Sequence, residues 1–165
     1  MNFINAQYIT SQFPWAKVAD ETYATLTKRQ LLDMYVHYWH VLDSVEDHDG
    51  EPLTRWLPNR DCDNKAGWFR MFSQAYYSIH FVSPLSKSEE KDMPQGVAVG
   101  EVWYQTRQGG GHAINVAFLD QGANKPPREV FIEPQTDPHG QGATIFVDLT
   151  TDERKSLKQY DFMRF

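Results

Sequence analysis

The pattern of apolar residues in the first third of the chain predicts one amphipathic helix. The segment Thr27 to Gln30 has the T-x-x-Q form of a capping box, which marks a helix start. Apolar residues recur beyond it at helical spacing: Leu31, Leu32, Tyr35, Tyr38, Trp39 and Leu42. The stretch that follows, Asp43 to Pro58, is acidic and contains glycine and two prolines, which predicts a long loop.

A second helical pattern begins at Cys62, the only cysteine of the chain. Apolar residues follow it at helical spacing: Ala66, Trp68, Phe69, Phe72 and Tyr76. Polar residues that favour a first helical turn surround the cysteine: Asp61, Asp63 and Asn64. We therefore expect Cys62 close to the N-terminus of an aromatic-rich helix.

Strand patterns fill the second half of the chain. After a polar connection from Pro84 to Pro94, short runs rich in β-branched or aromatic residues alternate with clusters of glycine, proline and asparagine. These runs are Val97 to Thr106, His112 to Asp120, Glu129 to Glu133 and Thr144 to Leu149. A last short helix is expected to begin at Thr151. Helices that precede an antiparallel sheet predict an α+β fold.

Composition narrows the class of protein. A chain of 165 residues with 41% hydrophobic and 14% aromatic content suits a single compact domain spanning residues 1–165. The net charge of −6 and the lack of a basic cluster argue against nucleic acid, and no apolar run is long enough for a membrane span. Met1 to Trp15 lacks the pattern of a secretory signal, so we expect a cytoplasmic protein. The oligomeric state stays open.

Three polar residues could form a nucleophilic site. A catalytic cysteine reacts as the thiolate, and a helix N-terminus and a neighbouring histidine both lower the pKa of its thiol. His112, directly after Gly109 to Gly111, is the candidate base for Cys62, and Glu133 on the next strand could orient its ring. Each residue also has an ordinary structural interpretation: a small buried cysteine, a hydrogen-bonded histidine and a solvated glutamate. The three glycines equally suit a hairpin tip.

Three short motifs around these residues occur in one order along the chain. They are Asp61-Cys62-Asp63-Asn64-Lys65-Ala66, Gly111-His112-Ala113-Ile114-Asn115 and Ile132-Glu133-Pro134-Gln135. The set resembles the papain-like cysteine protease domain of the fairy-ring mushroom agglutinin family, a domain also found in bacteriophage proteins. The resemblance covers roughly Thr54 to Leu149. Bacterial transglutaminase-like peptidases, with a comparable cysteine-aspartate helix start, stay open as a second family.

The resemblance implies a papain-like fold, in which N-terminal helices, one with the cysteine at its start, pack on an antiparallel β-sheet. It implies a cysteine hydrolase, a thiol protease, with Cys62 as nucleophile, His112 as base and Glu133 as the orienting residue. The partner would be a protein or peptide substrate that is cleaved at a peptide or isopeptide bond. The backbone N–H of Cys62 and the side chain of Trp56 or Asn59 would then stabilise the oxyanion.

A metal ion is also implied by the resemblance, because the fungal family member depends on calcium near its active site. A Ca²⁺ or Mn²⁺ ion is therefore the expected cofactor, with Asp61 and Asp63 as ligands. The same carboxylates could instead stabilise the helix N-terminus as caps. The acidic loop from Asp43 to Glu51 is a poorer site, because Val45 stands where an EF-hand loop needs aspartate.

A function of another class stays open as the alternative to the hydrolase. Family members commonly carry a second acidic residue and an aromatic residue after the cysteine-aspartate pair, where this chain has Asn64 and Lys65. This difference and the 14% aromatic content favour a catalytically inert binding or virion-associated protein that keeps the papain-like fold. Such a protein predicts a protonated, slowly reacting Cys62. If phage-encoded, it would occupy the host cytoplasm or the virion.

Overall fold

Two long helices and a six-stranded sheet form most of the structure. The computed structural model describes residues 2–58 and 60–162, the last five of them, 158–162, by backbone alone. The long helices are α2 (Lys28–Ser44) and α3 (Cys62–Tyr77), and the π-helical turn η1 (Ser78–Val82) continues α3. The shorter helices are α1 (Ala6–Gln12), α4 (Lys87–Glu90) and α5 (Thr151–Ser156).

The strands form two sheets. The larger has the order β2 (Lys17–Val18), β9 (Lys158–Phe162), β5 (Val99–Gln105), β6 (Gly111–Leu119), β7 (Arg128–Ile132) and β8 (Phe146–Val147). Its neighbours are antiparallel from β9 to β8, whereas β2 is parallel to β9. The smaller sheet joins β1 (Phe3–Asn5), β3 (Thr22–Ala24) and β4 (Gly96–Val97). Mixed helices and largely antiparallel strands agree with the expected α+β class.

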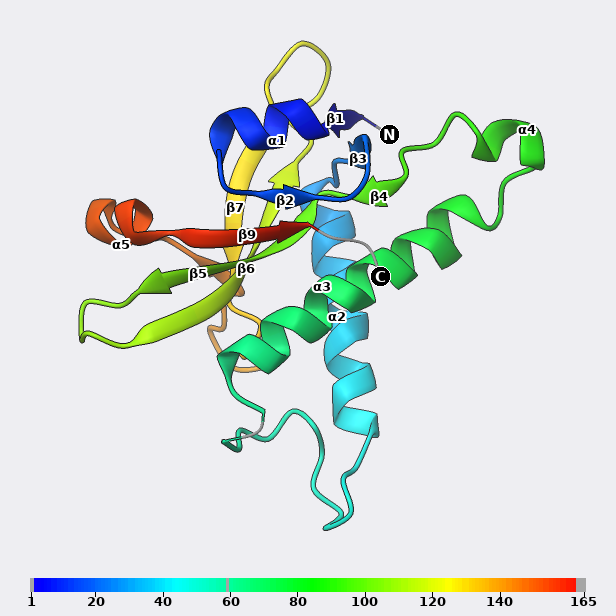
Figure 1. Ribbon diagram of the computed structural model, residues 1–165. Coiled ribbons are helices and arrows are strands. Elements are labelled where there is room, and N and C mark those ends of the chain that lie inside the picture. The colour runs from blue at the N-terminus through cyan, green and yellow to red at the C-terminus, as the bar shows by residue number, and fades with distance from the viewer. Residues whose placement is uncertain (1, 59, 163–165) are drawn as a thin grey trace.

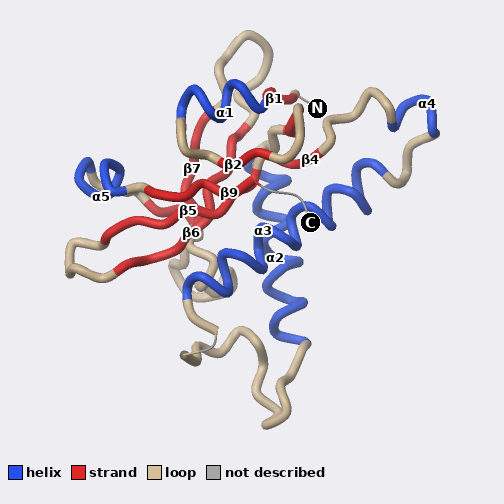
Figure 2. Tube along the Cα trace, viewed as in Figure 1, coloured by secondary structure: helices blue, strands red, loops and turns tan. Residues whose placement is uncertain are grey.

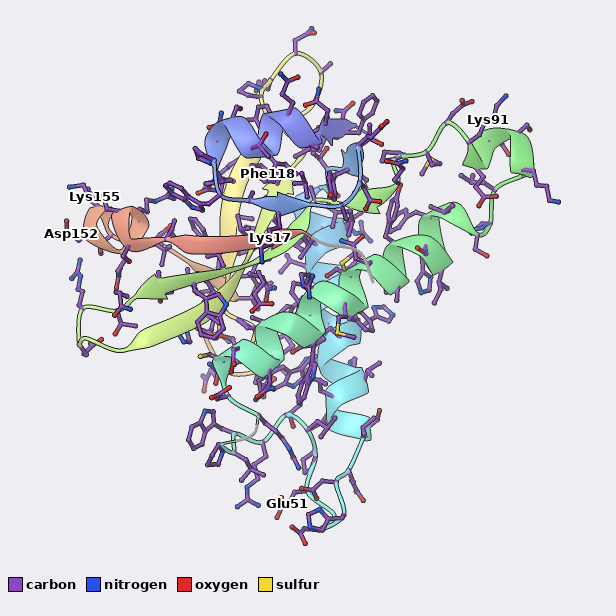
Figure 3. All side chains as sticks on the ribbon, in the orientation of Figure 1. Lys17, Glu51, Lys91, Phe118, Asp152 and Lys155 are labelled. Atoms are coloured by element: carbon purple, nitrogen blue, oxygen red, sulfur yellow. The ribbon has the colours of Figure 1, made fainter. Side chains whose placement is uncertain are left out.

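The larger sheet separates two hydrophobic clusters. On one face α2 and α3 cross each other and pack against the sheet (Figure 1). Tyr35 of α2 and Phe69 of α3 are fully buried there. On the other face lies α1, near Phe118 of β6, which is labelled in Figure 3. Ile9 of α1 is buried there, and Tyr8 contacts the Phe118 ring edge-on. Successive residues of a strand point to opposite faces, so β6 contributes to both clusters.

The hairpin of β5 and β6 extends away from α2 and α3 (Figure 2). Its turn is closed by hydrogen bonds from Thr106 N–H to the Gly110 carbonyl (2.8 Å) and from Gly109 N–H to the Thr106 carbonyl (3.0 Å). Gly109 has a φ of 88°, a left-handed conformation that glycine adopts at no steric cost. Gly109 and Gly110 therefore lie at a hairpin tip and Gly111 begins β6, which is the more ordinary of the two interpretations.

Two buried cations hold the loop between α2 and α3. Arg60, 5% exposed, forms an ion pair with Asp47. Lys65, 1% exposed, donates a hydrogen bond from Nζ to the Thr54 carbonyl (2.6 Å). The loop is thereby fixed against the first turns of α3, and its tip at Glu51 projects at the bottom of Figure 3.

The long helices begin where the sequence predicts. The capping box of Thr27 and Gln30 is complete at the start of α2, and α3 begins at Cys62. The helix expected at Thr151 is α5. In each case the signal is local, because the capping residues lie within one turn of the helix start.

The strands differ more from expectation. The run Val97 to Thr106 is divided between β4 and β5, because the chain passes at Ala98 from the smaller sheet to the larger. The run Thr144 to Leu149 shrinks to the two residues of β8. Leu149 instead packs in the cluster that contains α1, so packing there replaces strand pairing.

Candidate functional site

A buried side chain of β6 ties the first turns of α3 to the larger sheet. Asn115 of β6 is fully buried and donates from Nδ2 to the Ala66 carbonyl of α3 (2.9 Å) and to a carbonyl of β5 (3.1 Å). Near the same helix start, the backbone N–H of Ala113 donates to the sulfur of Cys62. The Cys62 thiol therefore lies beside the residue that directly follows His112.

His112 and Glu133 form a half-buried pair. His112 Nε2 donates to Glu133 Oε2 at 2.7 Å, with the two side chains 20% and 23% exposed. The ring of Tyr104, paired with His112 across the hairpin, meets the imidazole edge-on at 5.6 Å between ring centres. The Glu133 carbonyl accepts from the Tyr35 hydroxyl (3.0 Å), and its Oε1 accepts from the Gln135 N–H (3.2 Å). These contacts fix the pair in one arrangement.

The Cys62 thiol is not bonded to this pair. Among the described residues no hydrogen bond joins its sulfur to the His112 ring. Burial raises the pKa of the thiol, the Ala113 N–H lowers it, and the negative charges of Asp61 and Asp63 raise it again. The net direction is upward, so the thiol is protonated at neutral pH. A protonated thiol is a poor nucleophile.

The carboxyl groups of Asp61 and Asp63 lie within hydrogen-bond reach of each other. This bond is the largest cause of the raised pKa of Asp63, followed by burial and the negative charge of Asp61. Asp61 is the N-cap residue of α3, yet its side chain makes no capping hydrogen bond. The capping interpretation therefore fails for Asp61. Two adjacent carboxylates do offer oxygen ligands of the kind that Ca²⁺ and Mn²⁺ bind.

A second acidic group lies in the loop after α2. The ligand atoms of Asp47, His48 and Asp49 all lie within 4.8 Å of one another, the one such group of three among the described residues. One oxygen of Asp47 accepts the backbone N–H groups of Asp49 and Glu51, both at 2.9 Å, and the other pairs with Arg60. Because both oxygens are occupied, Asp47 serves to fix the loop.

The two residues considered for an oxyanion site have different outcomes. Trp56 lies on the loop before α3 with 59% of its surface exposed. Asn59 lies outside the described residues. Trp56 as a donor stays a prediction.

Lys65 is the residue of this site whose role the sequence analysis missed. Besides its bond to Thr54, its ammonium lies 5.9 Å from the centre of the Trp39 ring. Burial lowers the pKa of Lys65, and the negative charge of Glu133 opposes that shift. A signal was present: Lys65 stands four residues before Phe69, which places it on the core-facing side of the helix.

Comparison with known proteins identifies the fold. No family model and no curated protein matches the chain. A lectin of Polyporus squamosus, bound to the epitope Neu5Acα2-6Galβ1-4GlcNAc, has a similar structure, with a TM-score of 0.56, 16% identity and 89% of this chain covered. The structure of a PSL1a–E64 complex is also similar, with a TM-score of 0.53, 16% identity and 81% of this chain covered. The chain spans 41% and 44% of those proteins.

These similarities correct the expected activity. Solved structures that share the fold include a lectin, a class of protein that binds sugars, so the expectation of a cysteine hydrolase, or thiol protease, is wrong. The protonated Cys62 and its missing bond to His112 agree with this correction. The resemblance at this identity extends to the fold. Within the described residues, no helix combines the length and the apolar character needed to cross a bilayer.

Proposed function

We propose that this chain is a binding protein without hydrolytic activity. The observation that carries the proposal is the state of the thiol: its pKa is raised, His112 Nε2 is bonded to Glu133, and among the described residues no hydrogen bond joins the His112 ring to Cys62. A nucleophilic cysteine needs a depressed pKa or a base in contact with it. A binding protein needs neither.

The proposed binding protein keeps a papain-like arrangement. Support comes from the order of the parts: a cysteine at the start of α3, a histidine at the start of β6 and a glutamate just after β7. The buried Asn115 holds the helix and the strand together. The arrangement leaves 20% of the His112 side chain and 23% of the Glu133 side chain exposed, where a ligand can reach them.

Carbohydrate is the ligand class that we propose for this site. The similar Polyporus squamosus lectin is bound to a sialylated trisaccharide, and this chain spans less than half of that protein. Sugar hydroxyl groups both donate and accept hydrogen bonds, which suits a carboxylate beside an imidazole. Binding sites of this kind combine a few converging polar groups with apolar walls, and Tyr104 borders His112 here.

Calorimetric titration with Neu5Acα2-6Galβ1-4GlcNAc, and with the same glycan lacking the sialic acid, tests this ligand class. We expect binding to at least one glycan. Loss of hydrogen bonds to the ligand should make His112→Ala and Glu133→Gln bind it about tenfold more weakly. His48→Ala is the matched control, because His48 is exposed on the loop, and it should bind as the parent does. No binding to either glycan at millimolar concentration contradicts the carbohydrate proposal.

The thiol tests the absence of hydrolysis independently of the sugar. We expect iodoacetamide to label Cys62 no faster than it labels a free cysteine at pH 7.5, since the raised pKa leaves little thiolate. Intact mass after incubation with E64, the compound in the PSL1a complex, should be unchanged. Faster labelling, or a stoichiometric E64 adduct that is lost in Cys62→Ser, would refute the proposal of an inert binding protein.

Asp61 and Asp63 are proposed as ligands of a Ca²⁺ or Mn²⁺ ion. Their mutual hydrogen bond and the raised pKa of Asp63 indicate two carboxyl groups that a cation would stabilise in the ionised form. Titration of the apoprotein with CaCl₂ and with MnCl₂ should give one site that Asp63→Asn weakens and Asp152→Asn, on exposed α5, leaves unchanged. Equal affinity in both variants would place the ion elsewhere.

A further inference from the structure

A groove lies beside β7 and β8, away from the residues discussed so far. Its volume is about 430 Å³, within the range of ordinary ligand sites. Its lining includes four consecutive residues, Arg128–Phe131, which make up most of β7. It also includes Lys28 at the start of α2 and Arg154 of α5. The groove therefore follows the edge of the sheet.

That edge is only partly covered. Phe131 and Ile132 of β7 pair with β8, and in the part of the chain that the structure describes no strand pairs with the remaining outer edge, 128–130. β8 ends at Val147, and the chain then turns to bury Leu149 in the cluster on the α1 side of the sheet. An uncovered edge presents N–H and C=O groups that can pair with another extended chain.

The aromatic rings in the groove are already covered by cations. The Lys28 ammonium lies 5.1 Å from the centre of the Phe146 ring, and the Arg154 guanidinium lies 4.9 Å from that of Phe131. A cation therefore lies over one face of each ring, which leaves less ring surface on which a sugar or a flat ligand could stack. The free features of the groove are the strand edge and its charges.

The charges in the groove favour an acidic ligand. Arg154 is neutralised by Glu129, with 2.9 Å between Nη1 and Oε1. Lys28 and Arg128 are exposed, and among the described residues neither forms an ion pair. Among the residues that line the groove, Asp148 is the one further carboxylate that can offset the charges of these two cations. The net charge of the groove is therefore positive, although that of the whole chain is −6.

We propose that this groove binds an extended peptide segment with acidic side chains, which adds as a short strand to the open edge of β7. Backbone hydrogen bonds to β7 would fix the peptide, and Lys28 and Arg128 would receive its carboxylates. This second site is independent of the carbohydrate proposal, because it uses different residues and a different ligand.

The probe is the peptide acetyl-Val-Asp-Val-Asp-Val-amide, titrated into the full-length ¹⁵N-labelled protein and followed by NMR. We expect shifts of the amide signals of Arg128, Glu129 and Val130. Lys28→Ala and Arg128→Ala should each weaken binding about three- to fivefold, the effect of one exposed ion pair. Arg29→Ala is the matched control, since Arg29 is adjacent in sequence but is paired with Asp33, and it should leave binding unchanged.

Two further probes separate the parts of the proposal. A peptide N-methylated at its central residues keeps the charges but cannot donate to a strand edge, so it should bind at least about tenfold more weakly. A peptide with asparagine in place of aspartate should lose the contribution of Lys28 and Arg128. Equal binding of the N-methylated peptide, shifts confined to other amides, or free N-acetylneuraminic acid moving the 128–130 signals in the same way would overturn the proposal.

Discussion

Lys65 connects the cysteine-bearing helix to the loop in front of it. Its ammonium is removed from water, and the Thr54 carbonyl at 2.6 Å and the face of the Trp39 ring replace the lost hydration. Burial of a charge on these terms is costly, which is why the pKa of Lys65 is lowered. Lys65 therefore fixes the loop, but burial of its charge lowers the stability of the folded protein.

Replacing Lys65 by methionine tests this balance. The variant loses the bond to Thr54 but also the cost of the buried charge, so its free energy of unfolding at pH 7.5 should lie within about 1 kcal/mol of the parent. The unfolded chain keeps the Lys65 proton up to its ordinary pKa of 10.5, whereas the folded protein releases it earlier. The unfolded state thus binds more protons in the window below pH 10.5, and raising the pH stabilises the parent.

Urea unfolding at several pH values from 7.5 to 10 measures this effect. The stability of the parent relative to Lys65→Met should increase with pH across that range. Lys87→Met, at an exposed position of α4, should show no such trend relative to the parent. A difference that stays constant or shrinks with pH would mean that Lys65 titrates normally in the fold.

At the level of elements, α3 depends on one buried amide for its position. Asn115 bonds the Ala66 carbonyl at 2.9 Å and a β5 carbonyl at 3.1 Å, so it joins a helix and two strands. Loss of this residue should be strongly destabilising, because each of the two buried carbonyls would lose one donor. The position of Cys62 relative to β6 follows from this contact.

Asn115→Ala should lower the free energy of unfolding by about 2–3 kcal/mol, the sum of two buried hydrogen bonds. It should also speed amide exchange in the first turns of α3 more than in α2. Gln105→Ala, at the exposed end of β5, is the control and should change stability by less than about 0.5 kcal/mol. Equal protection of α3 in both variants would show that the helix is held mainly by its apolar face.

The elements that the sequence predicts are those with local signals. The capping box of Thr27 and the polar first turn around Cys62 locate both long helices to the residue. The loop, in contrast, is fixed by Arg60 and Lys65, whose partners in the loop lie 13 and 11 positions earlier. From a sequence alone, charged residues are expected to be exposed. Their burial depends on partners that come close only in the folded protein.

At the scale of the whole molecule, the two ends of the chain close the sheets. β2 near the N-terminus lies parallel to β9 near the C-terminus, and β3 lies parallel to β4 across some seventy positions. These strands have two to five residues each, too few for a periodic pattern. The pairing of His112 with Glu133 was predictable from motif order, whereas the lack of a hydrogen bond between the His112 ring and the thiol among the described residues depends on the positions of all three elements.

β9 is placed between β2 and β5, so its removal should open the sheet. Deletion of residues 158–165 takes the antiparallel partner away from Glu101 and Trp103 of β5. β5 would become an edge strand with a row of free backbone groups, which favours association between copies. We expect faster amide exchange along β5 and concentration-dependent self-association in sedimentation, while α2 stays protected.

A synthetic peptide of residues 158–165 should restore slow exchange when added in excess, because it can pair with β5 again. Failure of the peptide to do so, together with a monomeric deletion variant, would show that β5 is stable as an edge.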